Sequence, residues 1–109
     1  MRRLMLLALV ASLPAAAHQA PSGWDYDQDC CHTRDCAPVP DGAVAEVAGG
    51  YRVRVMPGSH PMLPPGAPPV DAFVPHGDRR IRVSGDEDRH ACLSRGGAVL
   101  CVYVPPGGV

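Results

Sequence analysis

Five cysteines and five histidines are the residues of this 109-residue chain with the clearest capacity to bind a metal or to react. The cysteines contain no C-x-x-C pair, which is the motif of thiol oxidoreductases. A zinc site from Cys30, Cys31, His32 and Cys36 would need all four ligands from one short segment, whereas zinc knuckles usually use two separated pairs. Disulfide bonding is therefore the expected role of most cysteines. The five cysteines are Cys30, Cys31, Cys36, Cys92 and Cys101.

The last two cysteines are predicted to bridge each other across a β-hairpin. If Gly96 and Gly97 form a two-residue turn, Cys92 lies opposite Cys101 in a non-hydrogen-bonded pair. Side chains approach most closely in such pairs, so this geometry suits a disulfide.

The three amino-terminal cysteines then have one bridge to form among them. Adjacent cysteines bridge each other only through a strained peptide, so Cys36 is expected to pair with Cys30 or Cys31. A competing arrangement ties this amino-terminal segment to the hairpin through two long-range bridges, with Cys30 or Cys31 reaching Cys92 or Cys101. It would stabilise the fold more, because a longer closed loop removes more entropy from the unfolded chain. Spacing alone does not choose between these arrangements, and the hairpin register favours the first.

Copper binding is the alternative chemistry that the histidines suggest. Cleavage after Ala17 would make His18 the mature amino terminus, whose amine and ring Nδ1 could chelate copper together with a second imidazole. Met56, His60 and Met62 share one segment and offer further ligands, including soft sulfur ligands for Cu(I). Such sites need a rigid arrangement that spacing cannot show, so the main hypothesis has no cofactor.

The first 17 residues have the pattern of a secretory signal peptide. Arg2 and Arg3 precede an apolar run, and small residues end at Ala17. The run is far shorter than the roughly 20 residues that span a bilayer, so no membrane insertion is expected after signal removal. We therefore predict a removed signal peptide, 1–17, and a single small domain, 18–109, in the periplasm or secreted. Disulfides persist in these oxidising environments.

Composition argues against several classes of function. Loss of Arg2 and Arg3 with the signal changes the formal net charge from −1 to −3, so no nucleic-acid partner is expected. The chain has no lysine, which removes Walker-type phosphate loops and Schiff-base chemistry. No serine lies in a nucleophile-elbow motif, and no carboxylate pair can be assigned as acid and base. No catalytic residue is predicted, and a non-enzymatic role is favoured.

Residues 44–55 are predicted to form a hairpin. A three-residue loop at 48–50 would place Val47 opposite Tyr51 and would separate the apolar from the charged side chains. A two-residue loop at 49–50 is the alternative, and it would set the valine against an arginine.

The remaining segments are short because glycine and proline interrupt them. Residues 56–75 contain seven prolines and are predicted to be a surface crossover without a central strand. A short strand is expected at 79–83 and a second hairpin at 90–104, whereas 24–37 form a loop or knuckle. The predicted fold class is mostly β: a small antiparallel sheet of two hairpins plus a short strand, stapled by disulfides.

Several spaced motifs resemble a group of small exported, cysteine-rich proteobacterial proteins of unknown function. They are Trp24-x-Tyr26, Cys30-Cys31, Asp35-Cys36, Arg89-His90-x-Cys92 and Cys101-x-Tyr103-x-Pro105-Pro106-Gly107-Gly108. The resemblance implies a secreted, cysteine-stapled domain and no catalytic residue. The main hypothesis is a structural or interaction module with an unidentified protein partner, and copper binding through His18 is the alternative.

Overall fold

The structure, a computed structural model, describes residues 19–107. Within this range the chain forms seven strands and no helix, so the described residues contain no helix long and apolar enough to cross a membrane. The strands are β1 (Cys36–Pro38), β2 (Val44–Val47), β3 (Gly50–Val55), β4 (Val70–Pro75), β5 (Ile81–Val83), β6 (His90–Leu93) and β7 (Val99–Val104).

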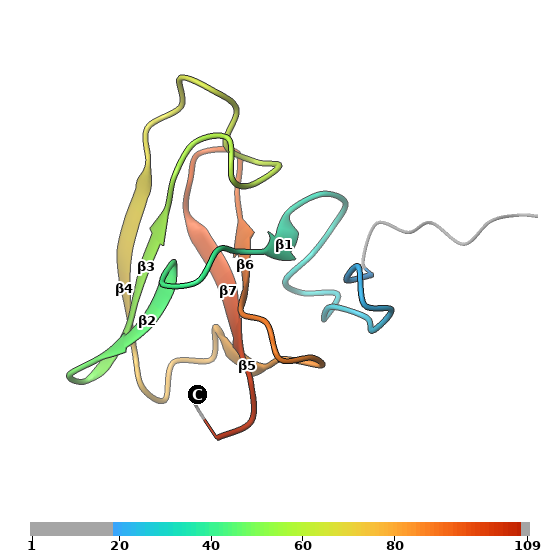
Figure 1. Cartoon of the computed structure of the whole chain (residues 1–109), viewed down its shortest axis with the longest axis vertical. Helices are drawn as coiled ribbons and strands as arrows, with labels where there is room; N and C mark the ends of the chain where they lie inside the picture. Colours follow the sequence, from blue (N-terminus) through green and yellow to red (C-terminus); the bar gives the residue numbers. More distant parts are fainter. Residues whose placement is uncertain (1–18, 108–109) are drawn as a thin grey trace, which may run out of the picture.

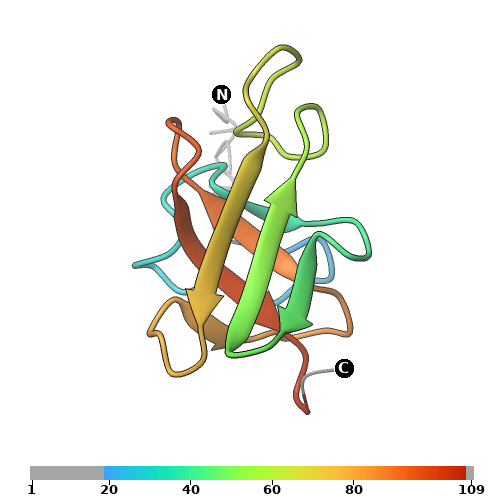
Figure 2. The same ribbon diagram turned by 90° about the vertical axis from the view of Figure 1, so that its left-hand side faces the viewer.

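The strands form two sheets that face each other (Figures 1 and 2). One is an antiparallel meander in the order β2-β3-β4, and the other has the order β1-β6-β7-β5, with β5 parallel to β7. The prediction of a mostly β, disulfide-stapled domain with an amino-terminal knuckle is confirmed. The two hairpins do not share one sheet, however. Two facing layers bury an apolar side of each sheet that a single layer would leave in water.

The space between the sheets is filled mainly by valine. In β3, Tyr51, Val53 and Val55 are buried, whereas Arg52 and Arg54 between them are exposed. This period of two is the expected pattern for a strand with one face on the core. The fully buried aliphatic residues of this core are Val44, Val53, Val55, Val74, Ala91, Leu93 and Val102.

The hairpin at 44–55 is confirmed, but its predicted register is wrong by one residue. Val47 pairs with Gly50, so the loop is 48–49, and Gly49 has the positive φ of 83°. Gly50 lies within the strand for a steric reason. A Cβ at this position would overlap the backbone of Val74, so only glycine allows β4 to approach so closely.

The second hairpin keeps its predicted register on the amino-terminal side of a bulge. His90 lies opposite Tyr103 and Cys92 opposite Cys101, as predicted. The register shifts after Cys92, so Leu93 pairs with Val99 and not with Leu100. The bulge places both Leu93 and Val99 in the aliphatic core and leaves Leu100 with the smaller aromatic cluster.

The proline-rich crossover contains a strand that the sequence analysis missed. Residues 70–75 form β4, which pairs with β3 over its whole length. The strand begins directly after Pro68 and Pro69 and ends at Pro75, at the edge of its sheet. An edge position tolerates proline at the strand ends because one side of the strand needs no ladder partner. The expected absence of a central strand is therefore consistent with the structure.

The predicted disulfide pairing is wrong. The bridges are Cys30–Cys101 and Cys36–Cys92, so Cys92 does not bond Cys101, and Cys36 bonds neither Cys30 nor Cys31. Cys92 lies between Cys36 on β1 and Cys101 on β7, one partner on each side. The hairpin register was therefore compatible with two pairings. The competing long-range arrangement is the one observed.

Candidate functional site

The knuckle was predicted at 24–37, but in the structure it comprises residues 19–35 and ends where β1 begins. It packs against β6 and β7 through aromatic rings and cystine sulfurs. Trp24 lies edge-on to three rings, with centroid distances of 4.8 Å to Tyr26, 5.0 Å to His90 and 5.3 Å to Tyr103. Gly85 allows this placement, because a Cβ at that position would meet the indole at 2.5 Å. The result is a second core that is aromatic where the first is aliphatic.

A chain of hydrogen bonds runs through this aromatic core. The Tyr26 hydroxyl lies 2.7 Å from Nδ1 of His90, and Nε2 of His90 lies 2.8 Å from Oδ1 of Asp86. The other Asp86 oxygen accepts from Nε1 of Trp24 at 2.9 Å and from the Ser22 hydroxyl. Catalytic triads use the same three groups in this order: a hydroxyl as nucleophile, an imidazole as base and a carboxylate that orients the imidazole.

Burial indicates that these hydrogen bonds stabilise the fold and do not form a reactive site. His90 has no exposed surface, and Tyr26 is 4% exposed. Burial raises the pKa of the Tyr26 hydroxyl well above its ordinary value, so a tyrosinate nucleophile is disfavoured. Burial also opposes ionisation of Asp86, but hydrogen bonds from His90 and its other donors outweigh this and hold its pKa well below the usual range. The chain therefore fastens the knuckle to the 84–88 turn and β6.

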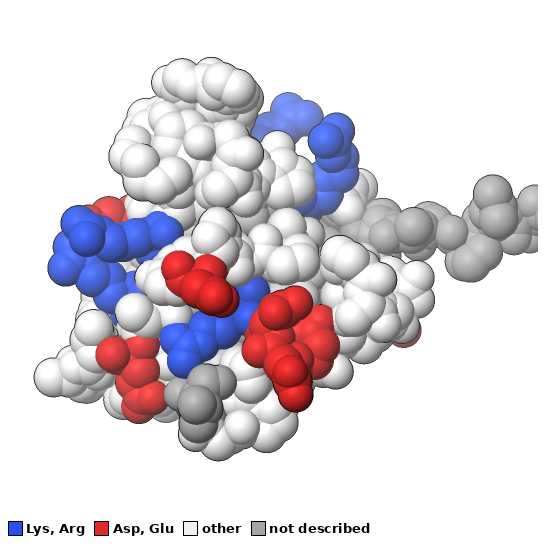
Figure 3. Space-filling view, viewed as in Figure 1, with Lys and Arg blue, Asp and Glu red and all other residues white. Residues whose placement is uncertain are grey.

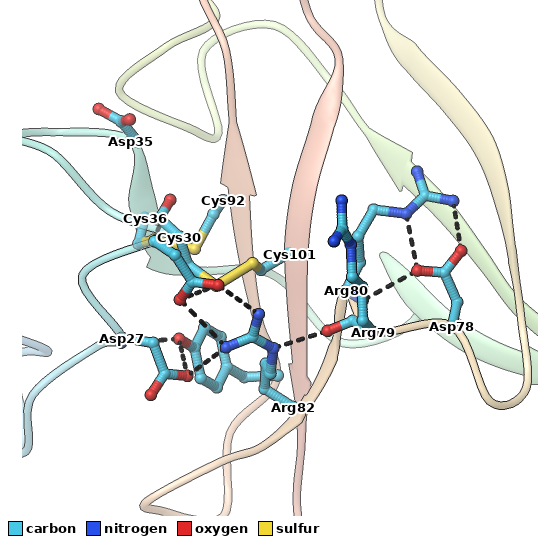
Figure 4. The surroundings of a disulfide bond; sticks show 12 residues. Asp27, Cys30, Asp35, Cys36, Asp78, Arg79, Arg80, Arg82, Cys92 and Cys101 are labelled. Atoms are coloured by element: carbon cyan, nitrogen blue, oxygen red, sulfur yellow. Dashed lines mark hydrogen bonds and ion pairs between the residues drawn. A yellow bond between two sulfur atoms is a disulfide. The ribbon is translucent and has the colours of Figure 1, made fainter.

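A second hydrogen-bonded group fastens the knuckle to β7. The Tyr103 hydroxyl donates to the Asp27 carboxylate at 2.8 Å and accepts from the Asp27 amide at 2.9 Å. Arg82, next on this surface, donates to Asp27 at 3.1 Å and to Asp29 at 2.7 Å (Figure 4). The Arg82 hydrogen bond holds the pKa of Asp29 below its usual value.

An open charged groove lies beside the Cys30–Cys101 bridge. Arg80 holds Asp78 through two guanidinium nitrogens, at 3.0 and 2.9 Å, and this lowers the pKa of Asp78 to about 2. Two of the three arginines that line the groove are thus paired with its two aspartates, Arg80 with Asp78 and Arg82 with Asp29. Its lining residues are Asp29, Asp78, Arg79, Arg80, Arg82, Val99, Leu100 and Cys101.

One group of potential metal ligands lies at the end of this groove. Asp27, Asp29 and Cys30 bring their ligand atoms within 4.8 Å of one another. The sulfur of Cys30 is bonded to Cys101, however, and both carboxylates accept hydrogen bonds from Arg82. The three ligand atoms are therefore already bonded within the protein, so the group does not fit a cation.

Three of the residues predicted to bind copper, Met56, His60 and Met62, lie within the described residues and form no open site there. Nε2 of His60 lies 2.8 Å from the carbonyl oxygen of Ala91, and Nδ1 accepts from the Met62 amide at 3.1 Å. Both ring nitrogens are therefore occupied, and burial lowers the pKa of His60. Met62 packs against the core, whereas Met56 is 60% exposed. His18 lies outside the described residues, and copper binding stays a prediction.

The outer face of the three-stranded sheet carries exposed apolar side chains. Phe73, the only phenylalanine of the chain, is 51% exposed on β4, and Val47 is 40% exposed on β2. Beside Phe73, Arg52 holds Asp71 through two nitrogens at 3.2 and 3.0 Å. The sheet groove, as we call this shallow hollow, is lined by Val47, Ala48, Arg52, Asp71, Ala72 and Phe73.

Sequence reasoning did not single out any residue of the sheet groove as a site. The alternation in Val70-Asp71-Ala72-Phe73-Val74 was the available signal, and the surrounding prolines obscured it. Neither a model of a protein family, nor a curated protein, nor a solved structure matches this chain.

Charges of both signs share one face of the molecule. On the side of the molecule seen in Figure 3, acidic and basic side chains lie next to one another, and a broad uncharged area lies at the top. This uncharged area corresponds to the loops between β3 and β4, whose residues 56–69 contain no charged side chain.

Proposed function

We propose that this protein is an exported structural module that acts by binding another protein through its sheet groove. The observation that carries the proposal is the exposure of Phe73. This chain is poor in large apolar side chains, yet its only phenylalanine lies half in water on an ordered strand. Aromatic residues and arginine are enriched in the cores of protein interfaces, and Phe73 lies directly opposite Arg52 in the sheet.

The geometry around Phe73 supports a rigid contact surface. Its ring lies over the backbone of Gly50, since a Cβ there would meet the ring at 2.9 Å. The Asp71 carboxylate is held by Arg52 and lies 3.5 Å from the guanidinium of Arg54. An aromatic anchor with polar neighbours already in place loses little conformational entropy on binding.

The distribution of reactive groups supports binding over catalysis. Tyr26 and His90 are buried, Asp86 is half-buried beneath its hydrogen-bond donors, and the carboxylates near the charged groove are paired with arginines. The side chains that could react therefore form hydrogen bonds and ion pairs within the fold. The exposed apolar side chains of the sheet groove make no such contacts. This division is what an interaction module requires.

Export is supported by the signal-like residues 1–17 and by the two disulfides, which are typical of oxidising compartments. The test is expression of the full chain in a Gram-negative bacterium, followed by fractionation and intact-mass measurement. We expect a periplasmic or secreted species that begins at His18, with two disulfides and one cysteine that is alkylated after unfolding without reductant. An uncleaved chain in the cytoplasm would overturn the export part. Copper offered to the same sample tests the copper alternative.

The binding part is tested by photo-crosslinking in the exported fraction. A photoreactive amino acid at Asp71, which lines the sheet groove on β4 and has a half-exposed side chain, reports on this surface. One at Val83, which is 69% exposed on β5, is the matched control. We expect a defined crosslinked product from position 71 that disappears with Phe73→Ser, and none from position 83. Equal products from both positions, or none from position 71, would overturn the proposal.

A further inference from the structure

We infer that the partner at the sheet groove is a second copy of this chain, which pairs antiparallel with β4 along its free edge. The inference rests on the proposed function and names the partner for the β4 side of the sheet groove, where Asp71, Ala72 and Phe73 lie. Two three-stranded sheets would then continue across a twofold axis as a single sheet. Figure 2 shows β4 at the outer edge of its sheet, beside β3.

The β4 edge differs from the other strand edges of the described residues. β1 and β5 have three residues each and β2 has four, whereas β4 has six. The β2 edge is also covered in part, because the guanidinium of Arg89 donates to the Val44 carbonyl. Short or covered edges resist pairing with another chain. β4 is therefore the edge best suited to strand addition.

The hydrogen-bond alternation shows which groups of β4 face outward. The Arg54 amide donates to Ala43 at 2.7 Å on the β2 side of β3, and the His76 amide donates to Gly49 at 2.9 Å. Alternation along an antiparallel ladder then directs the backbone groups of Val70, Ala72 and Val74 toward β3. The N–H and C=O groups of Asp71 and Phe73 consequently point toward the free edge.

These outward groups are self-complementary. When Asp71 lies opposite Phe73 of a second copy, the same pair occurs again on the other side of a twofold axis at Ala72. Each pair of this kind exchanges two backbone hydrogen bonds. Pro75 at the end of β4 lacks an N–H, which concentrates the pairing on Asp71 and Phe73.

The side chains also fit this register. On the outer face, Phe73 lies between Arg52 of its own copy and Asp71 of the second copy, so no like charges face each other across the axis. On the inner face, Val70 lies opposite Val74 of the second copy, and Ala72 lies opposite Ala72 of the second copy. All of these inner residues are apolar, and Val70 and Val74 are already core residues. A register with Asp71 opposite Asp71 of the second copy would instead place two carboxylates together.

Within β4, only Asp71 and the terminal Pro75 are residue types that protect a strand edge from a second copy. Prolines occur before the strand and at its last residue, and no lysine is present. The single charged side chain, Asp71, is neutralised by Arg52 and Arg54 of its own sheet. Strand pairing therefore requires no desolvation of an unpaired charge.

The test is sedimentation velocity of the mature chain over a range of concentrations, for the wild type and for Phe73→Pro. Proline at 73 removes an outward N–H without removing a hydrogen bond to β3. We expect a reversible wild-type dimer and a dissociation constant raised about tenfold or more in the variant. Near-ultraviolet circular dichroism checks that the variant is folded. A wild type that is monomeric at all concentrations, or a folded variant that dimerises equally, would overturn the inference.

A covalent trap keeps the inference testable if the proline variant does not fold. Ala72 of each copy would form a non-hydrogen-bonded pair on the axis, so Ala72→Cys is expected to give a disulfide-linked dimer under mild oxidation. Val83→Cys on the β5 edge is the matched control and is expected to stay mostly monomeric. Equal linkage of the two variants would count against the β4 register. A monomeric wild type that still shows Phe73-dependent crosslinking to another protein would reject the second copy and leave the proposed function intact.

Discussion

The knuckle and the three-stranded sheet are stabilised by different interactions, although they belong to one small domain. The knuckle contains none of the seven strands and is held by the Cys30–Cys101 bridge, by aromatic rings and by the Tyr26–His90–Asp86 hydrogen bonds. The sheet contains no disulfide, and its inner face is mainly valine. The disulfide and the hydrogen bonds thus stabilise the knuckle, whereas burial of apolar side chains stabilises the three-stranded sheet.

Reactive side chains and exposed apolar side chains lie in different regions of this protein. The residues with the richest chemistry, the cysteines, His90 and Asp86, are mostly committed to holding the knuckle. The sheet uses chemically plain side chains for its core and leaves Phe73 in contact with water. The sheet groove, the proposed binding surface, therefore lies in the region with the less reactive residues.

The largest expected effect is removal of the knuckle bridge. Cys30→Ala combined with Cys101→Ala opens a loop between residues separated by 71 positions and is expected to cost about 2 to 5 kcal/mol in urea unfolding. Hydrogen exchange should show lost protection in the knuckle and retained protection in β3. Cys36→Ala with Cys92→Ala, which keeps the knuckle bridge, is the matched comparison. Equal loss of protection in β3 and in the knuckle would abolish the distinction between the two regions.

The reciprocal change is in the core of the sheet. Val53 has no exposed surface, so Val53→Ala is expected to lower the free energy of unfolding by about 1.5 to 3 kcal/mol. The measurement is the urea midpoint at an unchanged m-value. Val83→Ala, at a valine that is 69% exposed, should change stability by less than about 0.5 kcal/mol. Similar losses at the two valines would show that burial between the sheets is not what holds this region.

The hydrogen-bond chain of the knuckle is tested with Asp86→Asn. The variant loses charge-assisted hydrogen bonds from Trp24 and His90 and is expected to cost about 1 to 3 kcal/mol at neutral pH. The folded-state pKa of Asp86 lies below its unfolded value, so its contribution is present above about pH 4 and is lost as the pH falls toward the folded pKa. Asp86→Asn should therefore flatten part of the loss of stability in acid. Glu87→Gln on the same turn is the control, and an unchanged acid profile in Asp86→Asn would contradict the assignment.

The smallest expected effect is a pH dependence from His60. Its folded-state pKa is lowered by burial, so the unfolded chain takes up a proton first as the pH falls below about 6.5. Stability is therefore complete above this pH and decreases through the folded pKa below it. His60→Gln, which can still donate to Ala91, should reduce the slope between pH 7 and pH 5, and His76→Gln, at a half-exposed side chain, is the control variant. Equal slopes in the wild type and His60→Gln would show that His60 does not report on the core.

The parts of the fold that could be predicted are those in which neighbours in sequence are neighbours in space. The Gly96-Gly97 turn places His90 opposite Tyr103 and Cys92 opposite Cys101, as counting from the turn predicted. The short strand before residue 84 was likewise found from its alternation, although its parallel pairing with β7 was not. Periodicity describes which face of a strand is buried, and it carries no information on which distant strand lies beside it.

Among the candidate sites, the clearest failure concerns the disulfides. Cys92 has one cysteine neighbour on β1 and another on β7, so the correct hairpin register led to the wrong bridge. β1 itself is only three residues long and ends at Pro38, so it is too short for an alternating pattern to predict it. The sheet groove was missed for a similar reason, because prolines on both sides of β4 hid its alternation.

The amino-acid sequence alone was sufficient for the class of the fold. Frequent glycine and proline exclude long helices, alternating residues indicate strands, and the cysteines compensate for few large apolar side chains. The division into two sheets, the choice of bridges, and the exposure of Phe73 emerged only when the distant segments were packed together. Local patterns are governed by backbone geometry over a few residues, whereas these features depend on how the whole chain shares a limited apolar interior.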